Sequence, residues 1–171
     1  FLQLHFLKIK IARIDKSKGY PLELIGKSFN SFYNKTLPFT LTNAQKKVLR
    51  EIRNDVKRDK QMNRLLQGDV GSGKTLVAIL SMLMAIDNGY QACLMAPTEI
   101  LANQHFITIS DYLSHHNINI ALLTGSTRKK ERILLHNNLE NGNIDILIGT
   151  HALLEDKVIF NNLAFVVIDE Q

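Results

Sequence analysis

The clearest indication of the fold of this chain is the segment Gly68-Asp69-Val70-Gly71-Ser72-Gly73-Lys74-Thr75. It fits the pattern Gly-x-x-x-x-Gly-Lys-[Ser/Thr] and lies between the apolar pair Leu65-Leu66 and an apolar helical pattern that begins at Leu76. In such a strand–loop–helix setting, the glycines let backbone N–H groups turn inward around phosphate oxygens, and the positive end of the helix dipole adds to the attraction. The alternative is a glycine-rich turn with an incidental lysine, which the agreement at every fixed position disfavours.

The residues of this loop have distinct predicted roles. Lys74 would bridge the β- and γ-phosphates of a nucleoside triphosphate, and the Thr75 hydroxyl would coordinate Mg²⁺. The backbone at Gly68, Gly71, Ser72 and Gly73 would surround the phosphates. The loop therefore predicts nucleotide binding, but it does not choose a reaction.

The segments on either side of the loop alternate between strands and helices. The expected strands cover residues 64–67, 92–96, 118–123, 144–148 and 165–168, and the expected helices cover 74–87, 99–115 and 128–140. A further helix is expected from a cap at Thr42 to about residue 60, with Leu41, Ala44, Val48, Ile52 and Val56 as its buried stripe. Strands that are apolar throughout and separated by helices predict an α/β fold, a parallel sheet covered on both faces.

Two carboxylates close the last apolar run of the chain. Asp169 and Glu170 follow the expected strand at 165–168, and carboxylates at the end of a parallel strand face the ligand crevice. Asp169 is placed to hold Mg²⁺, and Glu170 is placed to orient and deprotonate an attacking water. The alternative is an ordinary polar strand end. A second acid favours hydrolysis of the nucleotide over simple binding.

The identity of the base rests on two residues upstream of the loop. The Asn-Lys-x-Asp signature of guanine-binding proteins does not occur, whereas the amide of Gln45 can both donate to and accept from an adenine edge. Phe39 would pack near the base. For each residue alone, a surface glutamine and a core phenylalanine are the stronger interpretation. Together with the phosphate loop they favour ATP.

The bulk properties exclude some classes of protein. The net charge of +5 favours polyanionic partners, although charge alone is weak support. No apolar run approaches the roughly 18 residues of a membrane span. The single Cys93 excludes an internal disulfide, is expected in the core, and fits a cytoplasmic protein. The chain starts at Phe1 and stops just after the acid pair, which we interpret as a piece of a longer protein.

The order of these elements resembles the first motor domain of superfamily 2 helicases, and most closely the RecG family. The motifs, with their positions, are Leu-Pro-Phe-Thr-Leu-Thr-Asn-Ala-Gln at 37–45, Leu-Gln-Gly-Asp-Val-Gly at 66–71, Ala-Pro-Thr-Glu-Ile-Leu-Ala at 96–102, Leu-Thr-Gly-Ser at 123–126, Ile-Gly-Thr-His-Ala-Leu-Leu at 148–154 and Asp-Glu-Gln at 169–171. The transcription-repair coupling translocases share the phosphate loop and the Gly-Thr-His motif. They normally carry Asp-Glu-Glu where this chain has Asp169-Glu170-Gln171.

The resemblance implies a RecA-like fold for residues 37–171, truncated at the Asp-Glu-Gln motif (motif II), and a linker or the tail of a preceding wedge domain for residues 1–36. It implies an ATP-dependent DNA helicase that acts on branched DNA in repair and recombination, with a second motor domain and a wedge domain in the parent chain. It also implies DNA contacts at Thr98, Thr124, Ser126, Thr150 and His151. The hydroxyls suit phosphate oxygens and carry no base code, whereas a helix cap is the alternative for each. The role of His151 rests wholly on the resemblance.

Two other functions compete with this one. The first is a duplex DNA translocase of the transcription-repair coupling type. The second is a nucleotide-binding scaffold that does not hydrolyse ATP, which the intact phosphate loop and acid pair disfavour. Without a second motor domain and its arginine finger, the isolated chain is expected to bind ATP but to hydrolyse it poorly.

Overall fold

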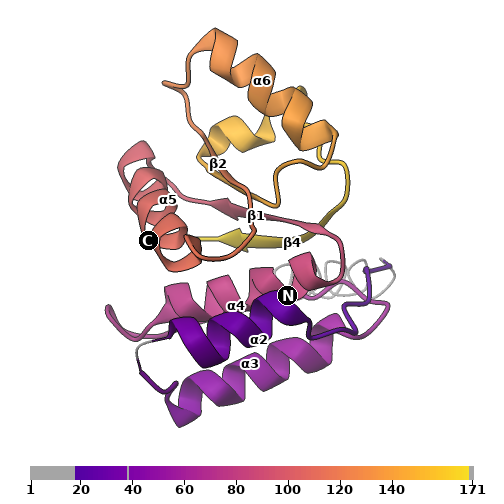
Figure 1. Cartoon of the computed structure of the whole chain (residues 1–171), viewed down its shortest axis with the longest axis vertical. Helices are drawn as coiled ribbons and strands as arrows, with labels where there is room; N and C mark the ends of the chain where they lie inside the picture. Colours follow the sequence, from indigo (N-terminus) through magenta and orange to yellow (C-terminus); the bar gives the residue numbers. More distant parts are fainter. Residues whose placement is uncertain (1–17, 38, 170–171) are drawn as a thin grey trace, which may run out of the picture.

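The computed structural model describes residues 18–37 and 39–169. Its centre is a four-stranded sheet, with helices around it (Figure 1). The strands are β1 (Gln91–Met95), β2 (Ile120–Leu123), β3 (Ile146–Gly149) and β4 (Leu163–Ile168). They are all parallel and lie in the order β2-β3-β1-β4. The predicted α/β architecture with a parallel sheet is therefore confirmed.

Side chains alternate between the two faces of the sheet and feed two apolar clusters. In β1, Ala92 and Leu94 belong to the larger cluster, whereas Cys93 belongs to the smaller one. Helices α4 (Lys74–Asp87) and α5 (Glu99–Leu113) contribute to the larger cluster, and α6 (Lys129–Glu140) contributes to the smaller one together with the 3-10 turn η2 (His151–Leu154). Helical segments therefore pack on both faces of the sheet, as apolar parallel strands require.

Helix α4 places the phosphate loop at the carboxyl edge of the sheet. The helix packs against β1 and β4, and it ends at Asp87, shortly before β1 begins at Gln91. A helix joined to the following strand by so short a turn runs antiparallel to it. Its first residue, Lys74, therefore lies toward the edge where the parallel strands end, which is where ligands bind in such sheets.

Helix α3 (Asn43–Val56) begins with the predicted cap. The Thr42 hydroxyl accepts from the Gln45 backbone N–H, and the Gln45 side chain accepts from the Thr42 N–H, which completes a capping box. Leu49, Ile52 and Val56 are its buried residues. Ala44 was wrongly predicted in this stripe, since it is exposed. In Figure 1, α3 lies beyond α4, away from the sheet.

The segment before residue 37 packs into the same core. It forms α2 (Lys27–Ser31) and a π-helical turn η1 (Phe32–Thr36). The polar sequence of residues 30–36 predicts a loop, and that prediction is wrong. Phe32 is fully buried, which explains why this polar stretch becomes helical. The carboxylate of Asp87, at the end of α4, accepts from the backbone N–H groups of Gly26, Ser28 and Phe29. Packing is therefore continuous across the predicted domain boundary at residue 36.

The strand predicted at residues 64–67 does not form. Arg64 instead binds the carboxylates of Glu51 and Asp55 on α3, and Leu65 is 81% exposed. The two arginine contacts hold this segment over α3. β4 consequently remains at the edge of the described sheet.

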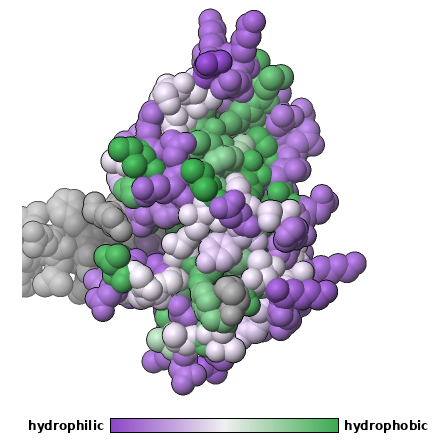
Figure 2. Space-filling model, turned by 60° about the vertical axis from the view of Figure 1, so that its left-hand side comes forward, coloured by the Kyte–Doolittle hydropathy of each residue, from purple (hydrophilic) through white to green (hydrophobic). Residues whose placement is uncertain are grey.

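Large apolar side chains interrupt the hydrophilic surface, as the patches in Figure 2 show. The exposed large apolar residues include Val166 and Ile168 of the edge strand β4, each with more than half of its surface exposed. Within the described part of the chain, none of the helices combines the length and apolarity that crossing a membrane requires.

Candidate nucleotide-binding site

The phosphate loop has the backbone conformation that its glycines predict. Gly71 and Gly73 have φ values of +80° and +81°, in the left-handed region that side chains rarely adopt. Gly73 is the N-cap of α4, and no side chain caps this helix start. The N-terminus of a 14-residue helix is therefore open toward an anion.

Lys74 points back over the loop that precedes it. Its Nζ donates to the carbonyl oxygens of Gly68 at 2.7 Å and Asp69 at 2.9 Å. An ammonium group carries three donors, so these contacts position the charge at the loop and leave donor capacity for a phosphate oxygen. Thr75 follows in the first turn of α4 and is partly buried.

Gln45 links the start of α3 to the phosphate loop. Its Oε1 accepts from the Thr42 N–H at 2.9 Å, and its Nε2 donates to the Ser72 carbonyl at 2.8 Å. The carboxamide that is predicted to contact adenine therefore already has a hydrogen-bond partner for its oxygen and another for its nitrogen. Phe39 is half-exposed. Both adenine contacts stay predictions.

Asp169 is held at the end of β4 by two contacts. Its backbone N–H donates to the Met95 carbonyl at 2.8 Å. Its Oδ2 lies 2.8 Å from Nε2 of His105, which comes from the second turn of α5. Sequence reasoning missed His105, because the two residues are 64 positions apart. Glu170, the predicted base, lies outside the described residues.

The side-chain oxygens of Thr75 and Asp169 are of the chemical kind that Mg²⁺ prefers. Within residues 18–37 and 39–169, no three His, Cys, Asp or Glu side chains converge to form a metal site. Mg²⁺ usually binds through one or two carboxylates together with substrate phosphates rather than in a protein cage. A Thr75 hydroxyl, an Asp169 carboxylate and the phosphates of a nucleotide are donors of this kind.

The five predicted DNA contacts all follow the ends of strands β1, β2 and β3, but their exposure differs. Thr98, Ser126 and His151 are exposed. Thr124 and Thr150 are buried, with 3% and 8% of their surface exposed. Thr98 also caps α5, since its hydroxyl accepts from the Leu101 N–H. The DNA contacts stay predictions, and the exposed members are the ones that a phosphate can reach directly.

Glu99 joins the loops that follow β1 and β2. Its Oε1 accepts from the Ser126 N–H at 3.1 Å and its Oε2 from the Ser126 hydroxyl at 2.9 Å. The Ser126 hydroxyl also lies 2.9 Å from the hydroxyl of Thr124. A carboxylate therefore already accepts from the Ser126 hydroxyl, which the prediction assigns to a DNA phosphate, and from the N–H of the same residue.

Arg132 extends this network toward the loop after β3. Its Nη2 donates to the Thr124 carbonyl at 2.9 Å, and its Nη1 lies 2.6 Å from both carboxylate oxygens of Glu155. The hydrogen bond from Arg132 lowers the pKa of Glu155. Sequence reasoning missed Glu99 and Arg132, although Glu99 lies inside a quoted motif and its charge is unusual beside a proposed phosphate site.

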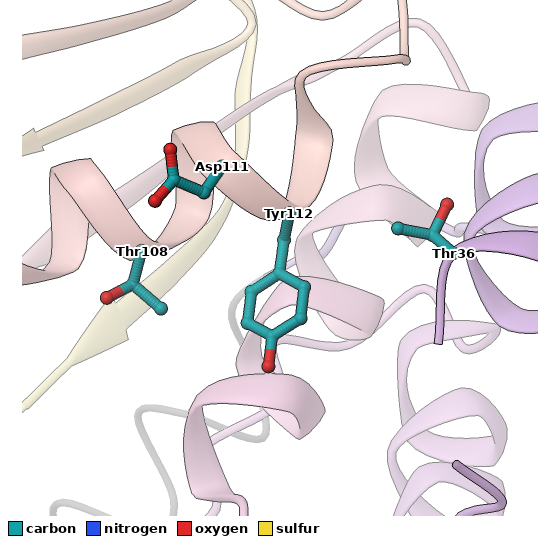
Figure 3. A pocket seen from close by; sticks show the side chains of 4 residues that line it. All are labelled: Thr36, Thr108, Asp111 and Tyr112. Carbon is teal, nitrogen blue, oxygen red and sulfur yellow. The ribbon is translucent and has the colours of Figure 1, made fainter. Parts of the chain in front are cut away.

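A separate pocket lies between η1 and α5 (Figure 3). Thr36, Thr108, Asp111 and Tyr112 line it. None of these residues belongs to the predicted nucleotide or DNA set. The Tyr112 ring packs edge-on against Phe32, with ring centroids 6.0 Å apart. The pocket is therefore a gap at the packing junction of the two helical segments.

Comparison with known sequences shows that this chain is similar to helicases. The model of the DEAD/DEAH box helicase family matches residues 42–171. The ATP-dependent DNA helicase RecG of Aquifex aeolicus is 48% identical over 165 residues, which are 96% of this chain and 21% of that protein. RecG of Thermotoga maritima is 51% identical over 170 residues, or 99% of this chain and 22% of that protein. The chain spans about a fifth of the length of these relatives.

Solved structures agree with the sequence relatives. A RecG bound to a three-way DNA junction superposes with a TM-score of 0.90 at 49% identity, covering 99% of this chain and 23% of that one. A hypothetical ATP-dependent RNA helicase from Sulfolobus tokodaii has a TM-score of 0.62 at 20% identity, covering 85% of this chain and 41% of that one. The second likeness shows the fold alone.

Proposed function

This chain belongs to the DEAD/DEAH box helicase family and is homologous to RecG, and on that premise we propose that it is the ATP-binding motor domain of a DNA helicase that acts on branched DNA. The observation that carries the proposal is the phosphate loop at the start of α4, at the same edge of a parallel sheet as Asp169. Ligands bind at this edge of parallel sheets, so a phosphate loop and a carboxylate at the same edge support a site for a nucleotide and its metal ion.

Each residue of the proposed site has a separate role in ATP hydrolysis. The open N-terminus of α4 and the loop backbone bind the phosphates, and Lys74 moves its ammonium from the loop carbonyls to the β- and γ-oxygens. Thr75 and Asp169 would hold Mg²⁺, which would neutralise charge that develops on the phosphates. Glu170 orients the attacking water and takes its proton. Gln45 and Phe39 select adenine.

The proposed partner is forked or branched duplex DNA. Exposed Thr98, Ser126 and His151 contact the phosphate backbone without reading bases. The parent protein supplies a second motor domain, whose arginine finger completes the ATP site, and a wedge domain that selects the fork. We therefore expect the isolated chain to bind ATP but to hydrolyse it poorly, and we expect the parent protein in the cytoplasm.

The test is ATP hydrolysis by the full-length protein with no DNA, with linear duplex and with a three-way junction. We expect strong stimulation by the junction together with unwinding. Equal stimulation by linear duplex without unwinding would indicate a transcription-repair coupling type of translocase. Absence of stimulation by any DNA would indicate a nucleotide-binding scaffold.

Two variants test the assigned residues in the same assay. Glu170→Gln should abolish turnover and spare ATP binding, because a carboxamide cannot accept the proton from water. Lys74→Ala should weaken ATP binding, because the loop loses its charge. Normal turnover by the first variant, or unchanged affinity in the second, would contradict the assigned role.

A further inference from the structure

The contact between His105 and Asp169 joins two segments that are distant in sequence. His105 Nε2 lies 2.8 Å from Asp169 Oδ2, and the two side chains are 17% and 26% exposed. An ionised carboxylate can only accept, so Nε2 is the donor. Both groups are partly buried, so the contact is shielded from solvent. It therefore differs from an ion pair on the open surface, which water weakens.

A second tether fixes the backbone of the same aspartate. The Asp169 N–H donates to the carbonyl of Met95, the last residue of β1. Helix α5, which carries His105, begins at Glu99, shortly after that strand ends. One β1–α5 unit thus holds both the main chain and the side chain of Asp169. The histidine occupies one carboxylate oxygen and leaves Oδ1 for a metal ion or its bound water.

We propose that His105 is a positioning residue, which orients the Asp169 carboxylate for the binding of Mg²⁺-nucleotide. The inference rests on the proposed function, because it takes Asp169 as a metal-binding residue. Carboxylates that bind metals are commonly held by a hydrogen bond from a neighbouring side chain, and loss of that neighbour typically costs about 10–100-fold in metal affinity or activity. His105 stands in this relation to Asp169.

A purely structural role for His105 makes a different prediction. In that case its removal lowers stability, and nucleotide affinity falls equally with and without Mg²⁺. A positioning role instead affects the gain in affinity that Mg²⁺ provides. The ratio of the two affinities therefore separates the roles, whereas a rate of hydrolysis alone does not.

The experiment uses the full-length protein and a fluorescently labelled ATP, titrated in excess Mg²⁺ and again in EDTA. His105→Leu removes the donor at similar volume. His105→Gln restores an N–H donor at a similar reach. His115→Leu makes the same change at an exposed histidine beyond the end of α5. Thermal melting of each variant reports its stability, and His105→Asn, whose amide is too short to reach Asp169, replaces the leucine variant if that one does not fold.

We expect the Mg²⁺-dependent gain in affinity to fall by about 10–100-fold in His105→Leu. If the gain of the wild type is itself smaller than this, we expect the variant to lose all of it. Its affinity in EDTA should equal that of the wild type, His105→Gln should recover most of the gain, and His115→Leu should retain all of it. An unchanged gain in His105→Leu, or equal losses in Mg²⁺ and EDTA, overturns the proposal. If the wild type itself gains nothing from Mg²⁺, the proposed function fails, and the inference fails with it.

Discussion

At the scale of single residues, Gly73 lies where no other residue fits well. Its φ is +81°, and an added Cβ would overlap Nε2 of Gln45. We expect Gly73→Ala to displace the Gln45 amide from Ser72, to lower the free energy of unfolding by about 1–3 kcal/mol, and to weaken ATP binding at least tenfold. Chemical denaturation and ATP titration measure the two effects.

Gly89 provides the matched control. Its φ is +79°, but a Cβ there would meet open space. Gly89→Ala should therefore cost about 1–2 kcal/mol of backbone strain and leave ATP affinity unchanged. Equal ATP affinities in the two variants would show that the Gln45 contact does not matter to the loop.

Cys93 should be inert in the folded protein. Burial raises the pKa of its thiol to about 12, far above physiological pH, and the thiolate is the reactive form. We expect a thiol-specific disulfide reagent at pH 8 to label Cys93 only after denaturation. Rapid labelling of the native protein would show that the strand opens locally.

Several residue-level features could be predicted from local sequence. The phosphate loop and the Thr42 cap depend on residues close together in the chain, so their spacing alone identifies them. The partners of Asp169 and Ser126 could not be predicted, because His105 and Glu99 are 64 and 27 positions away from them. Only the packing of α5 beside the strand ends brings these groups together.

At the scale of elements, helix α5 has a contact at each of two predicted sites. His105 binds Asp169, and Glu99 in the first turn binds Ser126. The Glu99 carboxylate holds the groups that a DNA phosphate would use. We expect Glu99→Gln in the full-length protein to strengthen binding of a three-way junction roughly fivefold, since removing one unit charge about 4 Å away is worth about 1 kcal/mol in water.

The control for this prediction is Glu140→Gln. It removes the same charge at the last residue of α6, whereas the Ser126 loop precedes the first residue of that helix. That variant should change DNA affinity little. The effect of Glu99→Gln should also shrink as salt is raised, because exposed charges are screened. Weaker DNA binding by Glu99→Gln would mean that Glu99 supports the loop instead of competing with the phosphate.

Most elements could be placed from hydrophobic periodicity. The predicted helix at residues 74–87 has the same bounds as α4, and those at 99–115 and 128–140 differ from α5 and α6 by a few residues at most. Residues 64–67 show the limit of this approach. Their apolar pattern favours a strand, but a strand needs a neighbour to pair with, and the ion pairs of Arg64 hold the segment over α3.

At the scale of the whole molecule, Gln91 ties together three segments at the amino edge of the sheet. Its buried Nε2 donates to the carbonyls of Leu139 and Ile144, and its Oε1 accepts from the Asn162 N–H. Gln91→Leu would leave these groups buried without partners. We expect a loss of about 2–4 kcal/mol in the free energy of unfolding, with ATP affinity unchanged because the proposed nucleotide site lies at the opposite edge.

Gln104→Leu is the control for this change, since Gln104 is exposed on α5. Its effect should stay within about 0.5 kcal/mol. A similar small effect for Gln91→Leu in chemical denaturation would mean that the three segments find other partners.

The strand order β2-β3-β1-β4, on which this cluster depends, could not be predicted, because periodicity identifies strands without saying which ones pair.

The carboxamide of Gln45 serves two structures at once, and this has a measurable consequence. One of its atoms caps α3 and the other holds the phosphate loop. If an adenine base recruits this amide, the helix start loses its reciprocal cap while the loop gains a ligand. Amide hydrogen exchange should then quicken at Thr42 and slow around Gly73, so that two opposite changes in protection would report one binding event.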